Sequence, residues 1–308
     1  MIPEPFNSLL SIILMILLGA FLCSKNWFSK ESTNLITRLI LDVAIPLSII
    51  SCVLGNITKG TLSELGASLL VPVLSIGLEY LISYLLAQMA NIPLSRKGLF
   101  ISMFSNPNTL FIGVPVNMAV FGVQSLPYVY IYYIVSTLFF NTIGILLLSK
   151  NDSSHMNFSA LLKKLITPIL ISFFITMFCL LCNIKLPDFI MGACESVGSI
   201  STPLSLMFIG ICLYQIPFRS LRINGEIFGV ILGRFLISPI ITYLIAKLLH
   251  TPELAMNVFL LQSFLPAMTS TPIFGERYHC DTKFATIGTA VTALLSLIVI
   301  PLYSGILF

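Results

Sequence analysis

Two short stretches hold side chains that could bind a small ligand. Residues 106–109 read Asn-Pro-Asn-Thr, with Pro115 shortly after them, and residues 269–272 read Thr-Ser-Thr-Pro, with Pro266 shortly before them. Amides and hydroxyls donate hydrogen bonds, so these groups suit the oxygens of a carboxylate. Proline lacks a backbone N–H and clashes with the preceding turn, so each stretch is expected to unwind a helix.

The elements that position these stretches are predicted to be membrane helices. Of the 308 residues, 57% are hydrophobic and 9% are charged, and the mean hydropathy is +1.01. A soluble domain is about a quarter charged and cannot bury this much apolar surface. The composition excludes a soluble enzyme, a nucleic-acid-binding protein and a disordered chain, and it makes the lipid bilayer the expected environment.

A helix needs about 20 apolar residues to cross a bilayer. Ten segments of the sequence meet this requirement, and the connections between them are short. The predicted spans are 6–23, 34–54, 64–89, 98–121, 125–149, 159–182, 191–213, 223–249, 254–277 and 282–305.

Basic residues alternate between the connections. Three lie in even-numbered connections, namely Lys59, Lys185 and Lys247. Odd-numbered connections hold twelve: Lys25, Lys30, Arg38, Arg96, Lys97, Lys150, Lys163, Lys164, Arg219, Arg222, Arg277 and Lys283. Because basic loops stay in the cytoplasm, this pattern predicts a multi-pass protein of the cytoplasmic membrane with both termini outside.

The chain shows a weak internal repeat. Residues 46–48 and 203–205 both read Pro-Leu-Ser, and Pro115 pairs with Pro272 at the same offset of 157 residues. Halves with an odd number of helices enter the membrane in opposite directions. We therefore predict an all-α polytopic membrane protein built from two inverted five-helix repeats, 1–150 and 151–308, with the fourth and ninth helices broken at mid-membrane.

Broken helices at corresponding positions are the best sequence indication of a transporter's binding site. The N-terminus of each half-helix carries about half a positive charge and unpaired N–H groups, which favour an anion. We therefore expect a small organic anion as substrate. The candidate binding residues at the breaks are Asn108, Thr109, Pro115, Ser270, Thr271 and Pro272. Local capping of the breaks is the alternative role for their polar side chains.

Three ionisable residues lie at membrane depth. A charged side chain there costs free energy, and such residues often have a function. They are Asp42, Glu79 and Arg234. Glu79 and Arg234 lie on helices that correspond in the two repeats, so they could neutralise each other. Alternatively, Glu79 could bind and release a proton. The third possibility is that Glu79 neither pairs with Arg234 nor exchanges a proton. Asp42 is a candidate for a second titrating group.

Four stretches resemble the auxin efflux carrier family, which includes plant PIN-type carriers and bacterial malate and malonate permease-like proteins. They are SNPNTLFIGVPV (105–116), STPLSLMFIGICL (201–213), GRFLISPI (233–240) and FLPAMTSTPIFGERYHCD (264–281). The resemblance implies a fold similar to bile-acid/sodium symporters and sodium/proton antiporters, with a crossing at Pro115 and Pro272. It also implies a scaffold of helices 1, 2, 6 and 7, a transport unit of helices 3–5 and 8–10, and a homodimer.

Within this resemblance, Asn108 matches the family's asparagine and Arg234 matches its RxxxxP arginine. Ser48 and Ser205, beside the repeated prolines, are expected on the scaffold side of the pocket. Close helix packing is an equally good interpretation of such small residues.

The predicted function is a secondary transporter of a small organic anion that works by an elevator-type alternation of access. The coupling ion is left open between H⁺, Na⁺ and none, and no metal or other cofactor is expected. A sensor of the same fold that binds an anion without moving it, and a channel, are the competing functions. No clustered catalytic groups indicate an enzyme. The sequence names neither the substrate nor the direction of transport.

Overall fold

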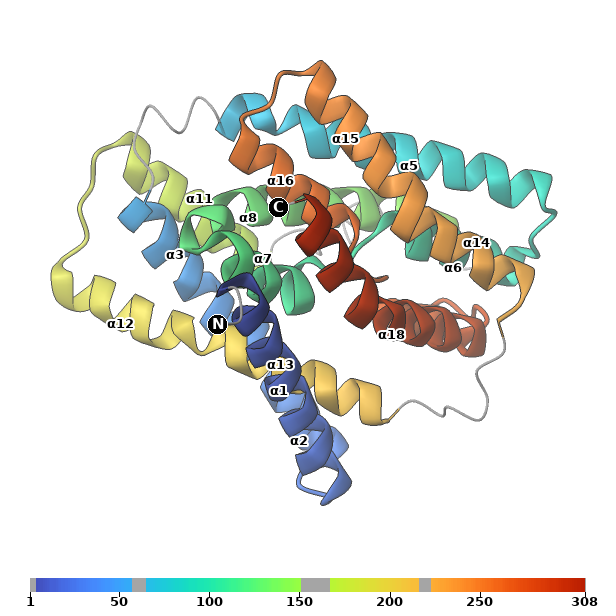
Figure 1. Cartoon of the computed structure of the whole chain (residues 1–308), viewed down its shortest axis with the longest axis horizontal. Coiled ribbons are helices and arrows are strands. Elements are labelled where there is room, and N and C mark those ends of the chain that lie inside the picture. Colours follow the sequence, from blue (N-terminus) through green and yellow to red (C-terminus); the bar gives the residue numbers. More distant parts are fainter. Residues whose placement is uncertain (1–3, 57–64, 151–166, 216–222, 308) are drawn as a thin grey trace. The chain divides into compact units, whose positions relative to one another are not determined.

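The computed structural model describes residues 4–56, 65–150, 167–215 and 223–307 (Figure 1). Within these ranges the regular structure is helical, apart from one antiparallel bridge between Pro107 and Ala267. In the part of the chain that the structure describes, six helices are long and apolar enough to cross a membrane. They are Glu31–Gly55, Leu65–Met89, Val123–Ser149, Asp188–Tyr214, Gly225–Leu248 and Thr282–Tyr303.

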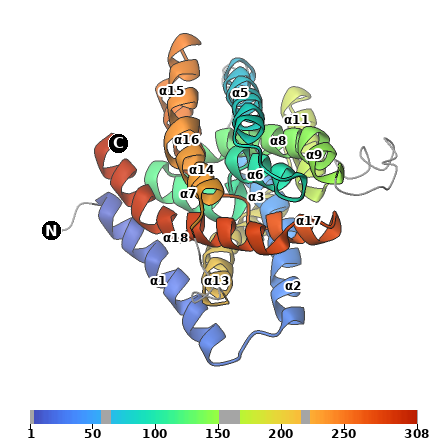
Figure 2. The ribbon, with the colours of Figure 1, turned by 90° about the vertical axis from the view of Figure 1, so that its right-hand side faces the viewer.

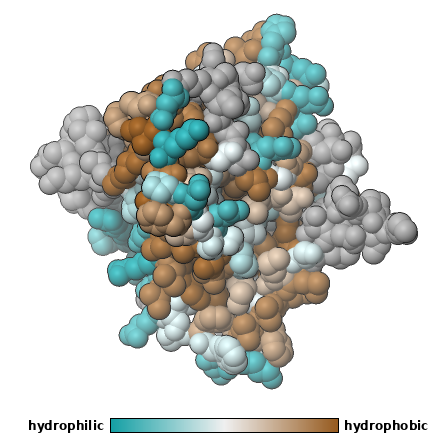
Figure 3. Space-filling view, turned by 90° about the vertical axis from the view of Figure 1, so that its left-hand side faces the viewer, coloured by the Kyte–Doolittle hydropathy of each residue, from teal (hydrophilic) through white to brown (hydrophobic). Residues whose placement is uncertain are grey.

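Shorter apolar helices cover Ser11–Ser24, Thr109–Phe121 and Pro168–Leu181. Large apolar side chains such as Leu14, Phe174 and Leu244 are exposed. Hydrophobic residues accordingly cover broad areas of the face in Figure 3. Such a surface is stable against lipid and would aggregate in water. The protein is a polytopic membrane protein, whereas the arrangement of ten helices as inverted repeats stays a prediction.

The chain folds as two compact units. Unit 1 comprises Met1–Ala67, Leu110–Tyr130 and Ile166–Ile216, and unit 2 comprises Ser68–Thr109, Ile131–Leu165 and Pro217–Phe308. The resemblance implied that the whole fourth helix moves with the transport unit. Residues 110–130 belong to compact unit 1, because α7 (Val114–Phe121) packs on α1 (Glu4–Ser24) and α13 (Ser201–Tyr214). The division into a scaffold and a transport unit stays a prediction.

Unit 1 is built from closely packed helix pairs. Helix α1 lies along α13, and α3 (Ile45–Asn56) packs on α11 (Pro168–Leu181) and α12 (Asp188–Ser199) (Figure 1). A π-helical segment, η1 (Leu39–Ala44), joins α2 (Lys30–Arg38) to α3. Glycine makes the α1–α13 contact possible, because a Cβ atom at Gly210 would clash with the carbonyl oxygen of Ile16.

Unit 2 centres on α5 (Leu70–Met89) and α6 (Leu94–Ser105), which pack on each other. Helix α15 (Ser238–Leu248) covers α5, and α18 (Thr282–Leu307) lies against α6 and α17 (Thr271–Arg277) (Figure 2). The remaining elements are η4 (Phe140–Gly144), α9 (Ile145–Ser149), α14 (Gly225–Leu232), η6 (Gly233–Ile237) and α16 (Glu253–Ser263). Helix α8 (Leu126–Phe139) begins in unit 1 and ends in unit 2.

Candidate functional site

The two broken helices meet in unit 2 through their backbones. Helix α6 ends at Ser105, and the chain is non-helical at residues 106–108. Helix α16 ends at Ser263, and α17 begins only at Thr271. The N–H of Asn108 donates to the carbonyl oxygen of Pro266 at 2.9 Å, and the N–H of Met268 donates to that of Asn106 at 3.1 Å. We call residues 106–108 and 264–270 the crossover.

The expectation that the helices cross at Pro115 and Pro272 is wrong in its location. The backbones meet at Pro107 and Ala267 instead. Pro272 occupies the first turn of α17, where the missing N–H leaves no hydrogen bond unmade, so this proline starts a helix rather than unwinding one. Pro115 lies inside the continuous helix Thr109–Phe121, just after its π-helical turn, so it does not mark the break either.

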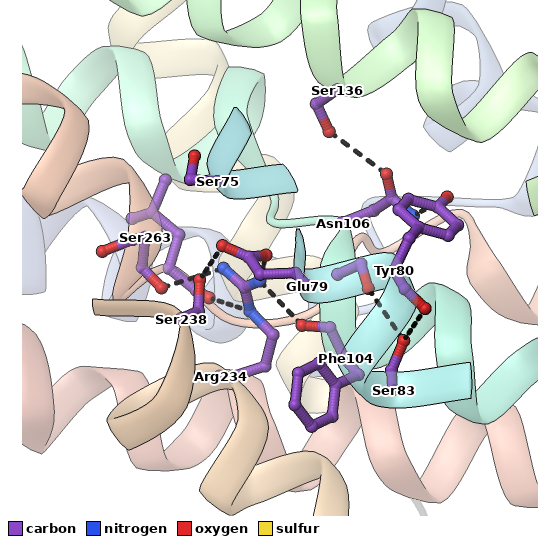
Figure 4. Close-up of polar contacts among 12 residues, drawn as sticks. Ser75, Glu79, Tyr80, Ser83, Phe104, Asn106, Ser136, Arg234, Ser238 and Ser263 are labelled. Carbon is purple, nitrogen blue, oxygen red and sulfur yellow. Dashed lines mark hydrogen bonds and ion pairs between the residues drawn. The ribbon is translucent and has the colours of Figure 1, made fainter. Parts of the chain in front are cut away.

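Arg234 ties together the ends of the two half-helices that enter the crossover. Its side chain is fully buried. Its Nη1 donates to the carbonyl oxygen of Phe104 at 2.9 Å, and its Nη2 donates to that of Ser263 at 2.9 Å. Its Nε donates to the carbonyl oxygen of Leu265 at 3.1 Å (Figure 4). The guanidinium therefore satisfies carbonyl groups that every helix leaves unpaired at its C-terminus.

A glycine brings Arg234 to this position. The neighbouring Gly233 faces Phe104 so closely that a Cβ atom would clash with the phenyl ring. The backbone of η6 can therefore approach α6 to within reach of its last carbonyl groups. The π-helical turn of η6 belongs to a class of irregular turn that often marks functional sites.

Glu79 lies beside Arg234 in the interior of unit 2. Both side chains are fully buried, and Oε2 of Glu79 is 3.5 Å from Nη1 of Arg234. The hydroxyl of Ser238 donates to Oε1 of Glu79 at 2.6 Å. Oε2 of Glu79 accepts no hydrogen bond from the described residues. Glu79 and Arg234, which we expected to lie on corresponding helices, are thus neighbours in space.

Asn106 holds the crossover to the rest of unit 2. Its amide donates to the hydroxyl of Tyr80 at 2.6 Å and accepts from that of Ser136 at 3.2 Å (Figure 4). The side chain is 1% exposed. Sequence reasoning did not single out Asn106, Tyr80 or Ser136. Asn106 stands in the same motif as Asn108, and no spacing rule distinguishes a structural amide from one that binds a ligand.

The side chain of Asn108 makes fewer and longer hydrogen bonds to the protein than that of Asn106. The amide of Asn108 makes one side-chain contact with the described residues, a long 3.5 Å donation to the hydroxyl of Thr269. Thr109 is buried at the start of a π-helical segment, and Thr269 and Ser270 are partly exposed. Thr271 is buried and donates to the carbonyl oxygen of Met268 at 2.7 Å, which caps the break locally. The structure thus brings the polar candidates of both motifs together in unit 2.

The candidates of unit 1 fall into a different environment. The hydroxyl of Ser48 lies 3.1 Å from that of Tyr130, and Ser48 packs against Gly198 of α12. Ser48 also lines a cavity of about 280 Å³ in unit 1, together with Thr202 and Glu195. Ser205 is buried and does not line this cavity. Close helix packing is therefore one role that the structure gives to Ser48.

Asp42 lies in η1 and is exposed on unit 1. Among the described residues, no ion pair joins it to a basic side chain. Its proposed role as a second titrating group stays a prediction.

Comparison with known proteins identifies the family. Residues 5–304 match the family described as "Membrane transport protein". The chain belongs to this family, the auxin efflux carrier family. This confirms the resemblance carried by the four motifs.

Two relatives extend over the whole transporter. An uncharacterized transporter of Methanocaldococcus jannaschii is 26% identical over 310 residues, which cover 98% of this chain and 99% of the relative. An uncharacterized transporter of Methanothermobacter thermautotrophicus is 25% identical over 308 residues, which cover 98% of each chain.

Proposed function

We propose that this membrane transport protein is a secondary transporter that carries a small organic anion by alternating access. The observation that supports this most strongly is the crossover, where two helices break at the same place and bond to each other. Non-helical backbone at membrane depth persists only inside protein or along a polar cavity. Breaking two helices there costs hydrogen bonds, and a binding site is the best explanation for that cost.

The side chains at the crossover favour an anion. Asn108, Thr269 and Ser270 can donate hydrogen bonds, and neither of the two crossover segments contains an aspartate or a glutamate. Such groups would bind a carboxylate without repelling it. Arg234 is fully buried and donates to three carbonyl oxygens, so it supports the crossover and is not free to bind a second carboxylate. We therefore propose that recognition rests on one carboxylate group.

The proposed mechanism moves the crossover together with unit 2. All of its residues and the Glu79–Arg234 pair lie in that unit. Rigid movement of one unit against another is the usual form of alternating access. The homodimer, the cytoplasmic membrane and the outside location of both termini remain part of this proposal.

The test is a thermal-shift screen of the detergent-purified protein. The panel holds monocarboxylates, dicarboxylates and indole acids, each with its uncharged amide as a matched analogue. A ligand that binds only the folded protein raises its melting temperature by mass action. We expect at least one carboxylate to do so and its amide to do much less. Equal shifts with acid and amide, or no shift with any acid in cooperatively melting protein, would contradict an anion site.

Flux measurements then separate a transporter from the alternatives. The carboxylate with the largest shift is used as a radiolabelled solute in proteoliposomes. A transporter shows saturable uptake and counterflow, whereas a sensor binds without flux. Uptake that does not saturate as the solute concentration rises would instead indicate a channel.

A further inference from the structure

The contact between Arg234 and Glu79 is unusually loose for a buried ion pair. An ionised carboxylate normally accepts short hydrogen bonds from arginine, at about 2.7–2.9 Å. The same protein shows this geometry elsewhere, because Arg96 lies 2.7 Å from Asp281 and 2.9 Å from Glu226. Arg234 instead stands 3.5 Å from Glu79 and gives its hydrogen bonds to backbone carbonyl groups.

The carbonyl groups already balance the charge of Arg234. The C-terminus of a helix carries about half a negative charge. Arg234 binds the C-terminal ends of both α6 and α16, so two such ends together offset about one positive charge. An ionised Glu79 would then leave this buried cluster with about one excess negative charge, whereas a protonated Glu79 leaves it neutral.

The hydrogen bonds at Glu79 fit a protonated carboxyl group. Oε1 accepts from Ser238, and Oε2, 3.5 Å from Nη1 of Arg234, accepts no hydrogen bond from the described residues. Leaving an ionised oxygen buried without a hydrogen bond is very costly. As a neutral acid the group requires far less solvation, and Oε2 can carry the proton.

We propose that Glu79 is the proton-binding site of this transporter and that it exchanges its proton with water during the transport cycle. The proton comes from water on one side of the membrane, binds the Glu79 carboxylate, and returns to water on the other side. No electron moves, and the only bond made and broken is the O–H bond. The coupling to flux rests on the function proposed above, whereas the proton site itself does not.

The groups that face Glu79 come from several elements. Tyr80 is next to it on α5, Arg234 belongs to η6, and Tyr132 of α8 lies near both Glu79 and Arg234. The hydroxyl of Tyr132 has no partner among the described residues, so it could bind a water that delivers the proton. Helix α15 contributes the neutral Ser238. The basic residues of α6 stand in its first turn, and Lys247 stands in the last turn of α15.

Infrared difference spectroscopy of the protein in lipid, without any substrate, tests the proton site. A buried carboxylic acid gives a carbonyl-stretch band that an ionised carboxylate lacks. We expect this band to disappear as the pH rises, and to be missing at every pH in Glu79→Gln. The variant Glu276→Gln, which changes an exposed glutamate, should keep it. A wild-type spectrum without the band, or with a band that never titrates, would overturn the proposal.

Transport measurements test the coupling. In wild-type proteoliposomes a proton gradient should raise the uptake of the selected carboxylate several-fold. Glu79→Gln should show no gradient effect but keep counterflow, since glutamine resembles the protonated acid. Equal stimulation in both proteins would overturn the coupling. If Glu79→Gln does not fold, Glu79→Asp replaces it, and an unchanged titration of the infrared band in that variant counts against Glu79. A band that titrates in protein that binds no anion would keep the proton site and reject only the proposed function.

Discussion

The backbone N–H of Asn108 donates to the carbonyl oxygen of Pro266, 158 residues away in the sequence, at 2.9 Å. Proline at position 266 has no N–H of its own, but its carbonyl is free to accept because α16 has already ended. The reciprocal bond from Met268 to Asn106 completes a minimal antiparallel pair. Two interrupted helices thus satisfy each other's exposed backbone groups, and four predictions follow from this arrangement and the contacts around it.

The two asparagines of the first motif should respond differently to alanine. Asn106→Ala removes bonds to Tyr80 and Ser136 and leaves buried groups unpaired, so it should destabilise the fold by about 1–3 kcal/mol. Asn108→Ala removes one long contact, so it should spare stability and weaken anion binding. Melting curves and anion titrations of both variants check this. Equal anion affinity in Asn108→Ala and wild type would remove Asn108 from the site.

Arg234 should be essential for the fold of unit 2. Arg234→Met leaves three buried carbonyl groups without donors, and each buried group that loses its hydrogen-bond partner costs about 1–3 kcal/mol. Denaturant unfolding in detergent measures the loss. The exposed Arg277→Met is the matched control and should change stability little. A stable Arg234→Met protein would mean that the carbonyl groups find other donors.

The close approach of η6 to α6 leads to a third prediction. Gly233→Ala places a methyl group against the ring of Phe104 and should cost about 1–3 kcal/mol through overpacking. Gly192→Ala, on a helix with open space at that position, should be neutral or stabilising, because alanine favours the helix. The melting temperatures of the two variants, measured by thermal unfolding, test this prediction. Similar melting temperatures would show that Phe104 moves aside at little cost.

Asp281 should give the protein a modest dependence on acid pH. Partial burial raises the pKa of Asp281, but hydrogen bonds from the N–H of Phe284 and from Arg96, with the charge of Arg96, outweigh it and lower the pKa overall. Its stabilising contribution is therefore complete above about pH 3.9, the pKa of an unfolded aspartate. The contribution is lost as the pH falls through the lower pKa of the folded state.

The contribution should be less than about 1 kcal/mol, because Arg96 is 35% exposed and solvent screens the pair. Asp281→Asn should flatten the acid side of the stability profile while keeping the cap on α18, since asparagine also accepts from the N–H of Phe284. Melting temperatures of wild type and variant, recorded from mildly acidic to strongly acidic pH, measure this pH dependence. The double variant with Arg96→Gln should add little, and full additivity would contradict the pairing.

The sequence by itself determined that the protein is a membrane protein and a transporter. Apolar runs long enough to cross a bilayer, short loops and the four motifs are local properties of the chain, and the helices and the family match confirmed them. The two proline-bearing stretches were also visible, because a missing N–H and a clash with the preceding turn act within a few residues.

Only the tertiary structure decided where the breaks lie and which polar groups are committed. Pro107 and Pro115 have the same local chemistry. Only Pro107 pairs with the segment that follows α16, where the carbonyl oxygen of Pro266 accepts from the N–H of Asn108. Likewise, Asn106 and Asn108 are the same residue type two positions apart, and the surroundings supply hydrogen-bond partners to one and leave the other nearly free. The partners of Arg234 belong to helices distant in the sequence, so no local pattern could name them. Hydrogen bonding and burial depend on which segments fold together, and that is a property of the whole chain.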